Sequence, residues 1–227
     1  MRYKFDFASL IDYWPAFLRG TLMTLNMTLI ALVFGLTIGV LCAIGRRGSI
    51  GWIRRICAGY VEIVRNTPFL IQIFFIYFGL ASIGLKLPVF FTAIFAMVFN
   101  VGAYSSEIVR AGMDAVPPGQ IEAAETLGLT RVQIYWDIIL RPALEKVYPA
   151  LTSQFVLMML ATSVTSQISA EELTAIANTI QSDTFRSFET FIVVAVLYLL
   201  LSLLMRVGFW LLALVLFPRR RKLGTAL

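Results

Sequence analysis

Long apolar runs separated by short polar stretches make up most of the chain, and they predict membrane-spanning helices. A hydrocarbon core about 30 Å thick needs roughly 20 apolar residues at about 1.5 Å per residue. We therefore predict an all-α, multi-pass membrane protein with a single domain over residues 1–227. Its five transmembrane helices are expected at about residues 17–45, 58–85, 87–112, 145–168 and 190–217.

Composition supports the membrane assignment. The chain has 227 residues, of which 59% are hydrophobic and 14% charged, and its mean hydropathy is +0.83. A soluble domain of this size is less apolar. The last apolar run begins at Thr190 and meets Arg206 after about 24 Å of helix rise. We expect the Arg206 side chain to extend toward the far headgroups.

The basic residues indicate the orientation. They concentrate between the first and second spans, between the third and fourth spans, and after the fifth span, whereas the opposite segments carry few. Because such residues are enriched in cytoplasmic loops, we expect the N-terminus outside and the C-terminus inside the cell inner membrane. Topology also explains the formal net charge of +6, so we expect no nucleic-acid partner.

Several chemistries are excluded by composition. The chain has no His, which removes histidine-based catalytic relays and leaves no plausible zinc site. No lysine follows a glycine, so the sequence lacks the phosphate-binding loop of nucleotide-binding proteins. We expect no enzymatic activity, no catalytic residue, no metal site and no cofactor bound by this chain. If ATP powers the protein, another chain binds it.

A polar loop at about residues 114–142 joins the third and fourth spans. Pro117 and Pro118 break the chain, and residues 120–127 then predict a short helix that ends in a left-handed cap at Gly128. A second helix follows at once, because Thr130 and Gln133 have the spacing of a capping box. We expect Pro142 to end it. The two helices either present a surface to a partner or pack on their own bundle.

Polar residues inside the spans are candidates for a substrate path. They share one face of the third span and recur at helical spacing on the fourth: Asn100, Tyr104, Glu107, Thr162, Ser163 and Gln167. The alternative is that each serves as an interhelical hydrogen-bonding group.

Charged residues near the helix ends predict ion pairs and a further helix. Glu62 with Arg65, and Glu107 with Arg110, are spaced as structural or gating pairs. A capping box from Ser169 to Glu172 predicts a helix to about residue 181 in the outer loop. Its acidic side chains either pair with a partner or face solvent. Residues 1–14 are expected to form a short amphipathic segment on the outer membrane surface.

The chain resembles the inner-membrane permease subunits of ATP-binding-cassette importers, in the polar amino acid branch. The resemblance rests on Glu122-Ala123-Ala124, Gly128 and Ile138 to Leu140, together with segments at residues 20–25, 65–72, 104–110 and 172–173. It implies the type I importer permease fold and alternating access for a polar amino acid. It further implies that Glu122, Ala123, Ala124 and Gly128 form the coupling helix that sits in a groove of the ATPase.

The resemblance also implies partners. These are cytoplasmic ATPase subunits that bind ATP and Mg, a second permease subunit in a homodimer or heterodimer, and an extracytoplasmic amino-acid-binding protein. Members of the family often carry Lys-Asp where this chain has Leu160-Ala161. We therefore expect a related second permease to supply more of the substrate contacts. The family's Leu-Pro is replaced by Leu140-Arg141, with Pro142 one place later.

Two other classes of function remain as alternatives. A stand-alone secondary transporter or channel for a small polar solute would need an ion-coupling site and usually an inverted repeat. The sequence shows neither a repeat nor a mid-membrane carboxylate. A structural membrane scaffold is disfavoured by the loop with its glycine hinge.

Overall fold

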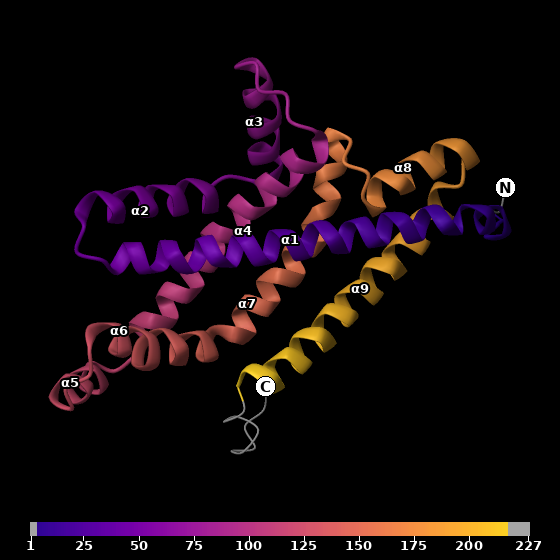
Figure 1. The fold of residues 1–227 in the computed structure, drawn as a ribbon. Helices are drawn as coiled ribbons and strands as arrows, with labels where there is room; N and C mark the ends of the chain where they lie inside the picture. The colour runs from indigo at the N-terminus through magenta and orange to yellow at the C-terminus, as the bar shows by residue number, and fades with distance from the viewer. Residues whose placement is uncertain (1–3, 218–227) are drawn as a thin grey trace.

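The computed structural model describes residues 4–217, and every regular element in that range is helical (Figure 1). The long helices are α1 (Trp14–Arg47), α4 (Val89–Asp114), α7 (Arg141–Ala161) and α9 (Ser187–Leu216). Shorter ones are α2 (Gly51–Arg65), α3 (Phe69–Ser82), α5 (Pro118–Thr126), α6 (Arg131–Gln133) and α8 (Leu173–Thr184). Two 3₁₀ helices, η1 (Ala8–Tyr13) and η3 (Thr162–Ile168), and a π-helix, η2 (Ile134–Leu140), extend them.

Four continuous helical stretches within the described residues are long and apolar enough to cross a membrane. They are Ala8–Arg47, Val89–Asp114, Arg131–Ile168 and Ser187–Leu216, and they cover the first, third, fourth and fifth predicted spans. The all-helical membrane fold is therefore confirmed. The short surface segment predicted for residues 1–14 is not a separate element, because η1 runs directly into α1. Residues 1–3 of that prediction lie outside the described range.

The second predicted span, residues 58–85, is not one helix. It is divided into α2 and α3, which meet at an angle of 111°. Thr67 precedes Pro68, and a residue before proline is driven out of the helical region, so the helix stops there. The Gln72 side chain donates hydrogen bonds to the carbonyl oxygens of Val64 (2.7 Å) and Thr67 (2.9 Å), which stabilises the bend.

Helices α1 and α4 approach each other closely because small residues face the contact. A Cβ atom added to Gly35 would lie 2.6 Å from the Cβ of Val101, and one added to Gly39 would lie 2.6 Å from the Cβ of Ser105. Gly35 and Gly39 are four residues apart, the spacing that brings transmembrane helices into backbone contact. The pair α1–α4 is therefore the centre of the fold.

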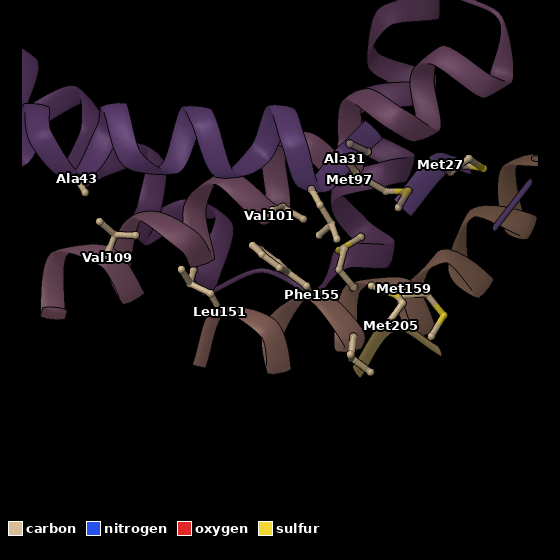
Figure 2. Packing of buried hydrophobic residues seen from close by; sticks show 14 of the residues in the cluster. Met27, Ala31, Ala43, Met97, Val101, Val109, Leu151, Phe155, Met159 and Met205 are labelled. Atoms are coloured by element: carbon tan, nitrogen blue, oxygen red, sulfur yellow. The ribbon is translucent and has the colours of Figure 1, made fainter. Parts of the chain in front are cut away.

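The main hydrophobic core lies where α7 packs on this pair. Figure 2 shows Met27 and Ala31 of α1 near Met97 of α4, with Phe155 and Met159 of α7 completing the cluster. Met205 brings α9 to the same core. A second cluster joins Leu10, Phe17, Leu173 and Ile180, so α8 is fixed to the start of α1.

The predicted helix end at Pro142 is wrong. The chain stays helical from Arg131 to Ile168, and Pro142 lies in the first turn of α7. Proline lacks the N–H that a continuing helix requires. The helix adapts because the turn just before it, Ile134–Leu140, widens into π geometry. Helix α6 and the fourth span are thus one continuous helical stretch, Arg131–Ile168, which we call the rod.

Candidate functional site

The short helix α5 ends in the geometry that the sequence predicts. Gly128 has φ of +75°, a left-handed conformation. Its N–H donates to the carbonyl of Glu125 (2.9 Å), and the Leu129 N–H donates to that of Ala124 (3.1 Å). These two bonds form a Schellman cap, which satisfies the last carbonyls of the helix. The predicted left-handed cap at Gly128 is confirmed.

The following helix also begins as predicted. The Gln133 N–H donates to the Thr130 hydroxyl (3.4 Å), and the Gln133 side-chain oxygen accepts from the Thr130 N–H (2.9 Å). The capping box is therefore confirmed. It sets α6 immediately after the Gly128 turn, so only a few residues separate α5 from the long rod that continues into α7.

Three side chains of α5 differ in exposure. Ala124 is 3% exposed and lies on the side that contacts η2, whereas Glu122 and Ala123 are exposed. The two small residues of α5 therefore belong to two different surfaces. Ala124 lets α5 lie against η2, and Ala123 with Glu122 remains available to another molecule.

Exposed apolar residues near α5 were missed by sequence reasoning. Leu127 is 79% exposed, Val132 78% and Trp136 61%. Leu127 follows α5, and Val132 and Trp136 lie in α6 and η2, at the start of the helical stretch Arg131–Ile168. Figure 1 shows α5 and α6 together at one end of the molecule. A group of large exposed apolar side chains beside a polar segment favours a protein contact. The signal was present in the sequence, because Val132 and Trp136 are four residues apart within a helix.

A cluster of charges lies at the same end of the bundle. The Glu107 carboxylate contacts three guanidinium groups, those of Arg46 from α1, Arg65 from α2 (3.8 Å) and Arg110 from its own helix. Asp114 adds contacts to Arg110 (2.7 Å) and to Arg47. The cluster ties α1, α2 and α4 together.

These contacts confirm one predicted ion pair and correct the other. Glu107 and Arg110 are paired. Arg65 was expected to pair with Glu62, but it contacts Glu107 and stacks over the Tyr104 ring at 5.8 Å. The Glu62 carboxylate accepts a hydrogen bond from the Asn66 side chain (3.2 Å) instead. The helix break after Arg65 sets its side chain free to reach α4.

The polar stripe proposed for the substrate path is not uniform. Asn100 is buried, and its side chain donates to Gln72 (2.9 Å). It therefore joins α4 to the bend between α2 and α3, the interhelical role that was the alternative. Thr162 is also buried, and its hydroxyl donates to the Met159 carbonyl. Among the stripe residues of η3, Ser163 is half-buried and Gln167 is exposed, so these two can meet a solute.

Glu172 was expected to act in the predicted capping box or to face a partner, and the structure shows otherwise. The cap of α8 is Glu172 itself, whose carboxylate accepts from the Ala175 N–H (2.9 Å), whereas Ser169 ends η3 in a left-handed conformation. Glu172 is 0% exposed, and the Tyr198 hydroxyl donates to it at 2.7 Å. Burial raises the pKa of this carboxyl above its ordinary value, while the hydrogen bonds oppose the rise.

This geometry can be compared with known proteins. Residues 35–217 match the family described as the inner membrane component of binding-protein-dependent transport systems. That segment covers α2 to α9 entirely, including α5 and the rod. The chain belongs to this family.

Individual members of the family are similar over most of their length. A putative glutamine transport system permease protein GlnP of Rickettsia bellii is 37% identical over 202 residues, covering 87% of this chain and 93% of that protein. The octopine transport system permease protein OccM of Rhizobium radiobacter is 31% identical over 96% of this chain and 92% of its own. The similarity to both proteins thus extends over most of this permease.

Solved structures agree with the fold. A crystal structure of an amino acid ABC transporter with histidines has a TM-score of 0.85 at 36% identity, covering 92% of this chain and 98% of the other. An inward-facing structure of the MetNI methionine ABC transporter matches with a TM-score of 0.74 at 23% identity, which supports the fold alone. This permease therefore has the type I importer fold and is a multi-pass protein of the inner membrane.

Proposed function

We propose that this chain is the membrane-spanning subunit of an ATP-driven importer that carries a polar amino acid delivered by an extracytoplasmic binding protein. Support for the substrate class comes from similar proteins whose names specify glutamine and octopine. The transport class follows the family. Cytoplasmic ATPase subunits would bind ATP and Mg, and the N-terminus would lie outside and the C-terminus inside.

The observation that carries the proposal is the exposed face of α5. Glu122 and Ala123 are open, and Leu127 adds apolar surface at the end of the same helix. The Schellman cap at Gly128 is formed by backbone hydrogen bonds. The exposed side chains of α5 are therefore not needed to end the helix. This face suits a groove of the ATPase.

A mechanical route leads from α5 into the membrane. Ala124 seats α5 against η2, and η2 continues without a break through α7 into η3. A displacement of α5 would therefore move a rod whose far end carries Ser163 and Gln167. We propose that closure of the ATPase subunits changes the access of these two residues by this route, as alternating access requires.

The second permease subunit remains part of the proposal. Leu160 and Ala161 contribute no charge at the end of α7, next to Ser163. A partner with a charged pair at this level would supply the substrate contacts that this chain lacks. We therefore favour a heterodimer, whose two subunits divide coupling and substrate recognition unequally.

Reconstitution tests the function. Liposomes would contain this chain with its ATPase and second permease, and uptake of labelled glutamine would be measured with the binding protein outside and ATP inside. We expect uptake only when ATP and binding protein are both present. Uptake driven by an ion gradient without ATP would contradict the proposal and favour a secondary transporter. Full uptake without the second permease would contradict the heterodimer alone.

A further inference from the structure

Helices α7 and α9 form the walls of a cavity of about 250 Å³ that is open to the protein surface, where Ser153, Arg206 and Trp210 are exposed. Tyr148, Thr152 and Ser153 line it from one face of α7. Arg206, Phe209 and Trp210 line it from the facing stripe of α9. The Tyr148 hydroxyl donates to the Phe209 carbonyl (2.7 Å), which holds the two helices together at this level.

The charge of this cavity is one-sided. Its lining includes the Arg206 guanidinium and three hydroxyl side chains, of which Tyr148 and Thr152 donate to backbone carbonyls, and it contains no Asp or Glu. Within residues 4–217, none of the ion pairs involves Arg206. A guanidinium in a membrane span is costly unless an anion or water accompanies it, so the site favours an anionic ligand.

The depth of the cavity places it next to the headgroups on the α5 side of the membrane. Arg206 lies about 28 Å of helix rise beyond the start of α9 at Ser187, close to the full thickness of a hydrocarbon core. On α7, Tyr148 follows the charged residue Lys146 by only two positions. Tyr148 and Trp210 are of the types enriched at the membrane interface.

Toward the membrane centre the same two helices expose apolar side chains. Leu157 follows Ser153 by one turn on α7, and Leu203 precedes Arg206 by about one turn on α9. A lipid headgroup bound at Arg206 would extend its acyl chains in this direction. A small soluble anion would gain nothing from these leucines, so the arrangement favours a lipid over a free solute.

From these features we propose that the cavity binds the phosphate of an anionic phospholipid in the leaflet next to α5. Arg206 pairs with the phosphate, Ser153 donates to its oxygens or to the headgroup, and Trp210 covers the site. Charge-assisted bonds of this kind are the strong ones in recognition of phosphate. The proposal does not depend on which solute the protein transports.

The test uses the purified full-length chain in a neutral detergent. Bound lipid is counted by native mass spectrometry, and thermal stability is followed as phosphatidylglycerol or phosphatidylcholine is added. We expect phosphatidylglycerol to bind and to raise Tm, because a ligand of the folded state stabilises it, whereas phosphatidylcholine has much less effect. Arg206→Gln should weaken the affinity for phosphatidylglycerol about tenfold or more.

Two further variants make the result specific. Arg54→Gln removes an exposed positive charge of α2 outside the cavity and should leave the affinity unchanged. Ser153→Phe fills the cavity while keeping Arg206, and it should also weaken binding, which decides the matter if Arg206→Gln does not fold. Equal responses to the two lipids, or equal affinity in Arg206→Gln and the wild type, would overturn the proposal. So would stabilisation by free glutamine or inorganic phosphate through Arg206 without any effect of phosphatidylglycerol.

Discussion

Two short helices connect the spans at opposite ends of the molecule, and their surroundings differ. Helix α8 is anchored on several sides: Leu173, Ala177 and Ile180 are buried, and the capping carboxylate of Glu172 is enclosed. Helix α5 buries Ala124 alone. Helix α5 has nine residues and α8 has twelve, and each begins after a break in the chain. Burial therefore distinguishes the structural connector from the docking helix.

The difference in burial indicates that α8 and α5 have different roles. The Leu173 N–H donates to the Thr24 hydroxyl of α1 (3.1 Å), and Tyr198 of α9 donates to Glu172, so α8 is joined to both α1 and α9. We interpret α8 as part of the rigid frame. Helix α5 touches the frame through η2 and leaves its other faces free, as a helix that transmits motion requires.

The largest expected effect is the loss of the buried carboxylate. Glu172→Ala removes the acceptor for the Ala175 N–H and for the Tyr198 hydroxyl, and it leaves a cavity. We expect a loss of about 3 kcal/mol in unfolding free energy, from a lost cap and an unsatisfied buried group. Unfolding in detergent, followed by circular dichroism, measures it. The neighbouring exposed acid provides the control, since Glu171→Ala should change stability by less than about 0.5 kcal/mol. Equal losses of stability in Glu172→Ala and Glu171→Ala would contradict the view that Glu172 belongs to the rigid frame.

Two glycines test whether α8 is packed more tightly than α5. A Cβ added to Gly20 would lie 2.9 Å from the Cα of Leu173, so Gly20→Ala must push α8 away. We expect a cost of about 1–3 kcal/mol. A Cβ at Gly119 in α5 would meet nothing within 4 Å, so Gly119→Ala should be neutral or stabilising by up to about 1 kcal/mol. A larger loss for Gly119→Ala than for Gly20→Ala would contradict the account.

The smallest expected effect is a pH dependence. Because burial raises the folded-state pKa of Glu172, its contribution to stability is complete below the ordinary carboxyl pKa and declines as pH rises through the raised value. Glu172→Gln removes this titration. Between about pH 4 and about pH 7, the Tm of the wild type should therefore fall relative to that of Glu172→Gln. Parallel Tm profiles would show that the carboxyl is not perturbed.

Local sequence patterns predicted most of the fold and the loop. The apolar runs located four spans, and the residue types at Gly128, Thr130 and Gln133 predicted caps that depend only on neighbouring backbone. The break at Thr67-Pro68 was also readable, because proline restricts the residue before it. Its position within a long apolar run concealed it. The spacing of Gly35 and Gly39 is typical of a helix-contact face, and only the structure identifies α4 as the partner.

Distant partners account for what sequence reasoning missed. Glu172 is satisfied by Tyr198, which lies 26 residues away, so nothing beside it in the chain indicates burial. Arg65 contacts Glu107 because the bend after α2 redirects it. Asn100 looked like a path residue until the fold placed Gln72 against it. Polar side chains in a membrane span acquire their role from the helix opposite, and spacing alone does not identify that helix.

The central claim is that the exposed face of α5 acts in coupling and not in folding. The most direct measurement compares Glu122→Lys with wild type for both properties: unfolding of the purified chain, and co-purification with the ATPase together with ATP-dependent uptake in liposomes. The account predicts unchanged stability, within about 0.5 kcal/mol, with loss of ATPase binding and uptake. Glu171→Lys, the same charge change at the opposite end, should retain its ATPase. A Glu122→Lys protein that binds the ATPase and transports normally, or that fails to fold, would contradict the claim.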